Sequence, residues 1–439
     1  MSERFRQVPL GRGATAHVLS APRFKTVTLS VYFHRPLERR TVTEQALLPS
    51  VLLRGSRRLP TLAALSRRLD ELFGASVSGG VEKIGEDQAV AFHLHAVDDR
   101  FLPPGRSVWR EAVEVLAGIV GDPLLEAGAF RGDYVEQEKA NLDRRIRGLY
   151  NDKARYANLR LLAEMCAGEP FALHALGFRE DLERIDARTL AERYAEVTAE
   201  APVDVFLVGG ERAEDLLPAV AEAFRWDRAG AAPLPATRPG EPPAQPRVVV
   251  ERQPVQQGKL AMGYRVGVTI ADPLYFALLM YNGILGGFVH SKLFRNVREK
   301  ASLAYYAGSH VDALKGVMIV SSGIEPKNYE RAVAIIEEQV ASMERGEITD
   351  EEMEFTRRAL AERLRTAADS PPALIGAALA ERLGGRSLSL EERIAGIEGV
   401  RRDDVVEVAR RVRLDTIFFL TQENGGASAA RAEEEAVRP

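Results

Sequence analysis

The chain has very few of the residues that build covalent cross-links or metal clusters. Its 439 residues include one cysteine, Cys166, and seven histidines. A single cysteine excludes an intrachain disulfide and any zinc site built from paired cysteines. Because it lies in the apolar segment "LLAEMCAG", we expect Cys166 to be a buried thiol.

Long apolar runs and an excess of one charge are also missing. No stretch approaches the roughly 18 apolar residues of a membrane span, and the N-terminal "MSERFRQVPLGRG" lacks the apolar core of a signal peptide. We therefore expect a cytoplasmic protein without a membrane partner. Since 59 Lys and Arg are balanced by 63 Asp and Glu, for a net charge of −4, nucleic acid is not an expected partner either.

The length predicts two domains, because single hydrophobic cores stop growing at roughly 250 to 300 residues. Residues 229–247 are rich in proline and small residues, which is typical of a semi-rigid linker. The sequence thus predicts an N-terminal domain over 1–228 and a C-terminal domain over 248–424. We expect residues 425–439 to form a disordered tail.

The two predicted domains are similar in sequence. The helical pattern at 110–120 has a counterpart at 330–340, and the long polar helix predicted near 134–152 has one near 352–370. Alternating or apolar runs predict strands in both copies, listed here: 26–33, 88–97, 203–210, 259–268, 316–324 and 416–422. Thr349 and Glu352 form a predicted capping box. The fold class is α+β, with two homologous domains that each contain a mainly antiparallel sheet backed by helices.

Residues 275–309 carry a family resemblance. The segment "YFALLMYNGILGGFVHSKLFRNVREKASLAYYAGS" resembles the second-domain signature of the pitrilysin/insulinase (inverzincin) metallopeptidases, and in particular the branch of the mitochondrial processing peptidase and its bacterial relatives. The first half of the chain is similar to that family's first domain. The resemblance implies that the two domains form one half of a clamshell.

The resemblance implies roles for Arg298 and Tyr305, which match an Arg/Tyr pair that reaches into the cleft in that family. A guanidinium binds a carbonyl or carboxylate, and a phenol donates a hydrogen bond to an oxygen that gains charge. In the alternative interpretation Arg298 forms a surface ion pair, for example with Glu299, and Tyr305 is half-buried. We expect Tyr306 to point to the opposite face of its strand and to lie in the core.

The zinc motif of the family is absent. Active members carry H-x-x-E-H on a helix and a distal Glu ligand. When Gly55 is aligned with the family's downstream glycine, Ala46 and Ser50 replace the two histidines and Pro49 replaces the base. Proline inside a helical stretch predicts a helix that is kinked or begins late.

The distal zinc ligand is also absent in this alignment. Glu138 matches an upstream glutamate of the family, and Arg145 occupies the ligand position, where its charge would repel a metal cation. His93 and His95 share one face of a predicted strand and could bind a metal with a third ligand, although a polar sheet face is the simpler interpretation. We expect no metal and no other cofactor in this chain.

With its zinc motif absent and its Arg/Tyr pair present, the chain resembles the non-zinc subunit of a heterodimeric zinc metallopeptidase, which implies that it is inactive alone. Its partner would be a homologous chain that carries H-x-x-E-H and zinc, and Arg298 and Tyr305 would bind the peptide substrate in trans. The first alternative is a non-catalytic peptide-binding or assembly subunit, in which the pair is residual. The second is an independent metal enzyme that uses His93 and His95.

Overall fold

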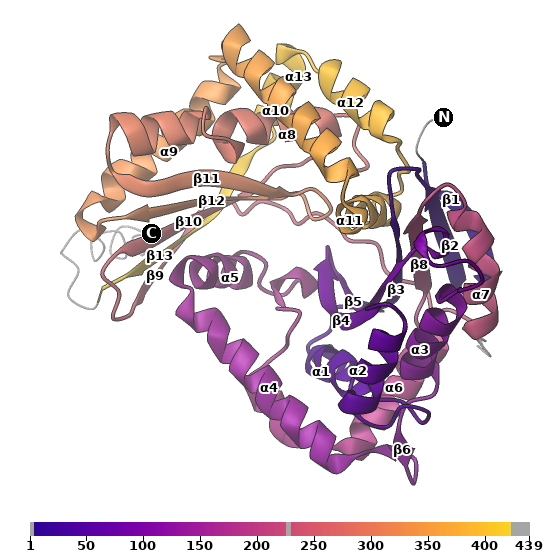
Figure 1. Cartoon of the computed structure of the whole chain (residues 1–439). Coiled ribbons are helices and arrows are strands. Elements are labelled where there is room, and N and C mark those ends of the chain that lie inside the picture. The colour runs from indigo at the N-terminus through magenta and orange to yellow at the C-terminus, as the bar shows by residue number, and fades with distance from the viewer. Residues whose placement is uncertain (1–3, 225–229, 423–439) are drawn as a thin grey trace. The chain divides into compact units, whose positions relative to one another are not determined.

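The computed structural model describes residues 4–224 and 230–422, and the predicted tail 425–439 lies outside the described residues. The chain divides into two compact units (Figure 1). The first unit comprises residues 1–147, 173–236 and 368–380, and the second comprises the other residues. No helix among the described residues is both long and apolar enough to cross a lipid bilayer.

The first unit contains a six-stranded sheet and a two-stranded ribbon. The sheet strands are β1 (Arg6–Gly11), β2 (Ala14–Ser20), β3 (Thr26–Pro36), β4 (Ser76–Ile84), β5 (Asp87–Val97) and β8 (Val203–Gly209), and the ribbon strands are β6 (Leu125–Glu126) and β7 (Ala129–Phe130). The helices of this part of the chain are α1 (Val42–Leu52), α2 (Leu62–Glu71), α3 (Trp109–Gly121), α4 (Gly132–Asn151), α6 (Ala187–Glu200) and α7 (Leu217–Ala223).

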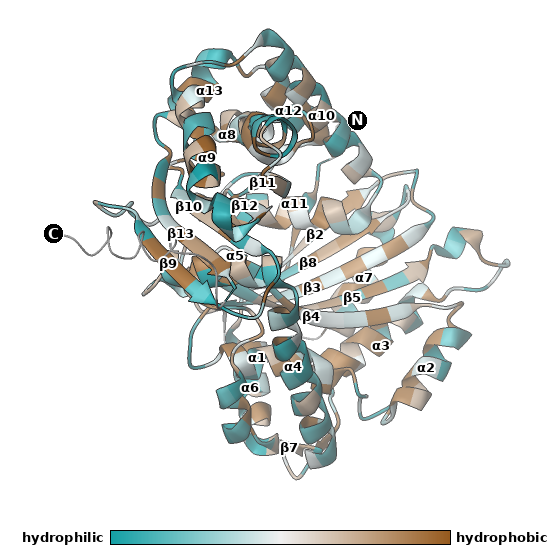
Figure 2. Ribbon diagram, turned by 90° about the vertical axis from the view of Figure 1, so that its left-hand side faces the viewer, coloured by the Kyte–Doolittle hydropathy of each residue, from teal (hydrophilic) through white to brown (hydrophobic). Residues whose placement is uncertain are grey.

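One face of this sheet forms the core of the first unit. The strand order is β1-β2-β8-β3-β5-β4, and Figure 2 shows α1, α3 and α6 against one face. Alternate residues of β3, such as Leu29 and Val31, join that core. The intervening residues, such as Ser30 and Tyr32, lie on the opposite face because side chains alternate along a strand.

The second unit contains a five-stranded sheet. Its strands are β9 (Arg247–Arg252), β10 (Gly258–Arg265), β11 (Ala304–Asp312), β12 (Val317–Ile324) and β13 (Arg413–Thr421). Its helices are α5 (Lys153–Met165), α8 (Tyr275–Asn282), α9 (Tyr329–Glu344), α10 (Asp350–Ala368), α12 (Leu390–Glu398) and α13 (Arg402–Ala409), with two π-helical segments, η5 (Gly283–Gly287) and η6 (Phe294–Lys300).

The strand topology confirms the α+β class and the duplication. The order β9-β13-β10-β12-β11 reproduces β2-β8-β3-β5-β4, with the first pair parallel and the others antiparallel in both sheets. The capping box is confirmed as well: the Thr349 amide donates to the Glu352 carboxylate at 2.9 Å, and the Glu352 amide donates to Thr349 Oγ1 at 3.1 Å.

Helix α5 comes from the first half of the chain but belongs to the second unit, where it packs on β10 and β13. Gly263 of β10 lies under this helix, because a Cβ there would come within 2.6 Å of Met165 Sδ. Cys166, at the end of α5, is buried as predicted. The sheet of the second unit is therefore packed on both faces in this region.

In the opposite direction, the second half of the chain contributes residues 368–380 to the first unit. They include most of α11 (Pro371–Leu383), and the Arg23 guanidinium donates to the Ala368 carbonyl at 2.7 Å. The compact units thus interleave along the sequence, whereas the predicted domains, 1–228 and 248–424, were continuous.

The described part of the predicted linker 229–247 contains no helix or strand before β9. Its first half is held by the first unit, since the Ala232 amide donates to the Glu200 carbonyl at 2.8 Å. Its second half is held by the second unit, since the buried Lys315 ammonium donates to the Arg238 carbonyl at 2.6 Å. The change of unit falls between residues 236 and 237.

A chain of buried ionisable side chains crosses four neighbouring strands of the first unit. His17 of β2 contacts Asp204 of β8 at 2.8 Å. His34 of β3 contacts Asp204 at 3.0 Å through Nε2 and Asp87 at the start of β5 at 2.5 Å through Nδ1. Burial by itself lowers the pKa of His34, but the two carboxylates outweigh it and raise that pKa to about 9. No local pattern in the sequence indicates this network, because its members are far apart along the chain.

The raised pKa of His34 predicts a pH-dependent stability of the first unit. The pKa of His34 is near 6.5 in the unfolded chain and about 9 in the folded one. Protonated His34 therefore stabilises the folded state fully below pH 6.5, and this stabilisation is lost as the pH rises to about 9. We expect the free energy of unfolding of this unit, measured with urea, to fall by on the order of 3 kcal/mol over that interval. His34→Gln should flatten the profile, whereas His95→Gln, a control whose pKa is lowered by burial, should keep it. Equal profiles in wild type and His34→Gln would contradict the assignment.

Candidate functional site

Arg298 lies in the last turn of the π-helical segment η6 and is exposed to solvent. Its guanidinium carbon stands 4.5 Å from the centroid of the Phe294 ring, a cation–π contact. Among the described residues no carboxylate forms an ion pair with Arg298, so the expected alternative pairing with Glu299 is not found. π-Helical turns occur often at functional sites.

Tyr305 is the extra residue of a β-bulge. Ala304 lies opposite Ile324, and Tyr306 lies opposite Gly323, so Tyr305 has no counterpart on β12. The bulge leaves the Tyr305 side chain 71% exposed, and the alternative of a half-buried Tyr305 is wrong. Bulges often re-aim a side chain next to an active site.

Tyr306 is less exposed than its neighbour but only partly buried, so the expectation that it lies in the core is wrong. Its ring packs on Gly323, where a Cβ would come within 2.6 Å of Tyr306 Cε1. The Lys259 ammonium is 5.7 Å from the centroid of the same ring. Burial raises the pKa of the Tyr306 hydroxyl to about 12, which favours a packing role for this side chain.

The pair lies on two consecutive elements of one unit. η6 packs against β11, and Ser302, in the turn between them, has a positive φ of 51°. No hydrogen bond joins Arg298 to Tyr305 within the described parts of the chain. Both polar groups thus face solvent, and each has donors available for an oxygen of a ligand.

The "LGG" segment holds β11 in place. Gly286 of η5 lies so close to β11 that a Cβ would come within 2.5 Å of the Ser309 backbone nitrogen. Next to it, the Ser309 hydroxyl donates to Asn282 Oδ1 at 2.8 Å. Only glycine allows this approach of backbone to backbone, and it fixes the strand that carries Tyr305.

The position of the family's zinc motif lies on α1 and contains no metal ligand. Ala46 and Pro49 are buried, and Ser50 is partly buried. The helix begins at Val42 and continues through Pro49, so the expectation that it begins late is wrong. The alanine, proline and serine present do not fit a zinc ion, which needs imidazole, thiolate or carboxylate ligands.

An ion pair links the end of the motif helix to α4. Arg54 Nε, just beyond α1, contacts the Glu138 carboxylate at 2.7 Å, and both side chains are largely buried. Arg145, at the predicted position of the distal ligand, is exposed on α4. Glu138, which matches the family's upstream glutamate, is thus the partner of an arginine.

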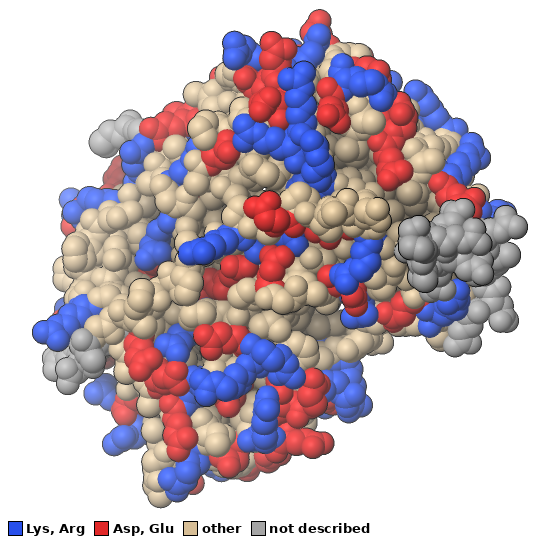
Figure 3. All heavy atoms as spheres, turned by 180° about the vertical axis from the view of Figure 1, so that it is seen from behind, with Lys and Arg blue, Asp and Glu red and all other residues tan. Residues whose placement is uncertain are grey.

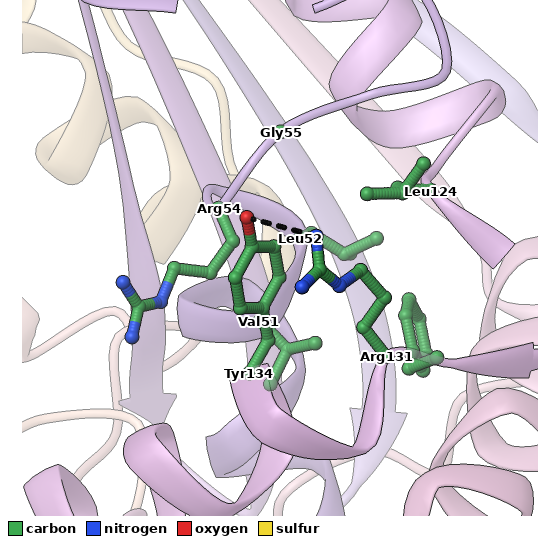
Figure 4. Close-up of a pocket in the computed structure, with 8 residues that line it drawn as sticks. Val51, Leu52, Arg54, Gly55, Leu124, Arg131 and Tyr134 are labelled. Carbon is green, nitrogen blue, oxygen red and sulfur yellow. Dashed lines mark hydrogen bonds between the residues drawn. The ribbon is translucent and has the colours of Figure 1, made fainter. Parts of the chain in front are cut away.

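A small pocket lies between the end of α1 and the start of α4 (Figure 4). The Tyr134 ring lies between two guanidinium groups, with Arg131 4.3 Å and Arg54 5.1 Å from its centroid. Arg131 also donates to the Tyr134 hydroxyl at 3.5 Å. With a volume of about 10 Å³, the pocket has room for a single water molecule and not for a substrate.

His93 and His95 lie on the polar face of β5, as the simpler interpretation predicted. His93 Nδ1 is 2.9 Å from the Ser30 hydroxyl, and His95 Nδ1 is 3.0 Å from that of Thr28. Burial, with a smaller effect of His95, lowers the pKa of His93. Within residues 4–224 and 230–422 no three His, Cys, Asp or Glu side chains group closely enough to hold a metal.

The described charged side chains on one face of the molecule do not gather into a field of one sign. On the face shown in Figure 3, basic and acidic side chains are interspersed. Many of them form exposed pairs, such as Arg345 with Glu347 at 2.7 Å. Exposed pairs of this kind contribute little to stability.

The chain is similar to known proteins along nearly its whole length. A family model for the peptidase M16 inactive domain matches residues 184–360. The probable inactive metalloprotease YmfF of Bacillus subtilis is 38% identical over 415 residues, which cover 94% of this chain and 97% of that protein. The uncharacterized zinc protease YmxG of the same organism is 24% identical over 198 residues, 44% of this chain and 48% of YmxG.

Solved structures show the same fold. A conserved protein from Enterococcus faecalis is 33% identical and has a TM-score of 0.88, with 96% of this chain and 100% of that chain covered. A protease from Helicobacter pylori is 15% identical, with a TM-score of 0.78 and the same coverage. These similarities confirm the resemblance that the sequence of residues 275–309 indicated.

The close contact of Gly286 with the backbone of β11, the strand that carries Tyr305, can be tested by mutation. Gly286→Ala should destabilise the second unit by about 1 to 3 kcal/mol, because the backbone of β11 has to move away from the added methyl group. Gly148→Ala, in the open on α4, is the control and should be neutral or stabilising. Urea unfolding of the two variants measures the difference, and equal midpoints would show that η5 and β11 are not in close contact.

Proposed function

Because this chain belongs to the peptidase M16 family and lacks the family's zinc motif, we propose that it is the non-zinc subunit of a heterodimeric zinc metallopeptidase. Its partner is a homologous chain with an intact H-x-x-E-H motif and a bound zinc ion. Arg298 and Tyr305 bind and orient the peptide substrate in the partner's active site. The chain alone does not hydrolyse peptides.

The observation that carries this proposal is the contrast between two sites in one chain. The zinc-motif positions hold Ala46, Pro49 and Ser50, none of which is a zinc ligand of the usual types. Arg298 and Tyr305, by contrast, are exposed, and neither side chain forms an ion pair or a hydrogen bond with another described residue. A chain that had lost all dependence on a substrate would have no need for this pair.

The chemistry of the pair suits the peptide bond. The planar guanidinium of Arg298 has donors for a carbonyl or carboxylate oxygen. The phenol of Tyr305 donates to an oxygen that gains negative charge as the carbonyl is attacked. The metal and the general base come from the partner, so this chain contributes binding and charge stabilisation.

Strand addition is the expected mode of peptide binding. β11 is an edge strand, paired only with β12 among the described strands, and Tyr305 lies near its start. β4 is the corresponding edge of the first unit. An extended peptide that pairs with such an edge gains main-chain hydrogen bonds without a requirement for particular side chains.

A second candidate function is a peptide-binding or assembly subunit without any part in catalysis. The cation–π contact favours it, since Arg298 already has an intramolecular partner in Phe294. In that case the pair is residual, or it holds a peptide that is not cleaved. The two functions differ in whether loss of the pair changes peptide turnover.

Removal of either group should lower the activity of the reconstituted pair of subunits. We expect Arg298→Ala and Tyr305→Phe each to reduce kcat/KM on the order of 100-fold, the usual effect of a lost transition-state donor. Ser50→Ala is the matched control and should leave kcat/KM unchanged, because Ser50 ligates no metal. Equal turnover in wild type, Arg298→Ala and Tyr305→Phe would favour the assembly function.

Zinc should be bound by the partner chain and not by this chain. When the tagged chain is purified at its natural abundance from its own host, we expect one homologous H-x-x-E-H chain at equal amount and about one zinc ion per pair. The chain purified alone should contain no zinc after dialysis, measured by atomic emission. Stoichiometric zinc in the isolated chain would contradict the proposal and point to an independent metal site.

A further inference from the structure

The Arg298 guanidinium lies over the ring of Phe294, and both residues belong to η6. The guanidinium carbon is 4.5 Å from the ring centroid. Phe294 is partly buried, whereas Arg298 is exposed. Leu293 and Val297, which precede these two residues, are fully buried and belong to the core of the second unit. The Phe294 ring therefore stands on a segment that the core holds in place.

Hydrogen bonds also fix the backbone that carries both side chains. The Ala301 amide donates to the Asn296 carbonyl at 3.2 Å, the spacing of a π-helical turn. The Asn296 side chain in turn donates to Gln339 Oε1 of α9 at 2.6 Å. Since the backbone of η6 is already anchored, the contact with Phe294 restricts the side chain of Arg298 and not the position of its backbone.

A contact with an aromatic ring leaves the hydrogen-bond donors of Arg298 available. The attraction acts between the positive charge and the face of the ring, whereas the N–H groups of a guanidinium point outward in its own plane. A carboxylate partner would instead occupy two of those N–H groups. Phe294 can thus orient the guanidinium without using the donors that a carbonyl oxygen needs.

The contact also limits the rotamers of an exposed side chain. A long side chain that is fixed only when a ligand binds loses conformational entropy, and this loss weakens binding. Contact with Phe294 restricts Arg298 before the ligand arrives, so less entropy is lost. In the part of the chain that the structure describes, no carboxylate forms an ion pair with Arg298 that could restrict it in the same way.

We propose that Phe294 is a positioning residue, which holds the Arg298 guanidinium in the orientation that receives the carbonyl oxygen of the peptide. Phe294 acts through Arg298 and does not itself bind the substrate. This inference rests on the proposed function, because it assumes that Arg298 binds the substrate. It gives the cation–π contact a role in turnover, whereas the assembly function leaves the contact without one.

Nuclear magnetic resonance of the isolated chain, with labelled arginine, tests whether the ring restricts Arg298. The ring current of Phe294 shifts the resonances of the Arg298 guanidinium. We expect Phe294→Leu, which keeps most of the apolar volume, to remove this shift, and Phe294→Tyr to keep it. Arg345, which carboxylates hold at the end of α9, is the reference and should not move. Identical Arg298 resonances in wild type and Phe294→Leu would overturn the proposal.

Turnover by the reconstituted pair of subunits tests whether this orientation matters. We expect Phe294→Leu to lower kcat/KM about threefold, the size of an exposed cation–π contact, and Phe294→Tyr to keep the wild-type value, because its ring also attracts a cation. In the Arg298→Ala background Phe294→Leu should have no further effect, since the ring acts only through the guanidinium. A purely structural role would give the same loss in both backgrounds and would overturn the proposal.

The same measurements separate this inference from the proposed function. If Arg298→Ala lowers turnover and Phe294→Leu does not, the positioning role is wrong and the proposed function stands. If Arg298→Ala leaves turnover unchanged, the proposed function fails, and the positioning role fails with it.

Discussion

The packing of α5 on the sheet of the second unit is the interaction on which the candidate site depends. Tyr156 and Leu161 of α5 cover Ala261, Phe418 and Leu420, residues that point away from the main core of that unit. With helices on its other face as well, the sheet is buried on both sides around β10 and β13. Close packing of this kind makes a sheet stiff, and the stiff sheet supports the edge strand that carries Tyr305.

The site itself sits on irregular backbone at the border of that sheet. η5 and η6 are π-helical, Ser302 has a positive φ, and Tyr305 occupies a bulge. Each feature costs some stability and persists only where the surrounding packing holds it. Gly286 provides that packing, because it lets η5 approach β11 closely.

The first unit is a regular scaffold without zinc ligands at the positions of the family's motif. The helix that corresponds to the zinc motif is present, yet its ligand positions are apolar or small, and Arg54 pairs with Glu138 beyond its end. In the same unit the ion pairs of His17, His34, Asp87 and Asp204 connect four strands. An apolar core and buried ion pairs hold this unit together.

Much of the fold follows from short-range patterns in the sequence. The alternation in 26–33 and 259–268 predicted β3 and β10, and Thr349 with Glu352 predicted the start of α10, because these signals depend on neighbours along the chain. β4 was missed, since Gly79 and Gly80 interrupt its pattern. The choice of Arg298 and Tyr305 came from similarity over a long segment, and periodicity alone would not have found it.

The sequence by itself determined the duplicated α+β domains, the missing zinc ligands and the two residues of the candidate site. Only the tertiary structure decided that α5 and residues 368–380 belong to the opposite units and that His34 contacts Asp87 and Asp204. The reason is physical: secondary structure and ligand types are set by residues close in sequence. Burial partners are set by which surfaces fit together across hundreds of residues, and no local pattern encodes that fit.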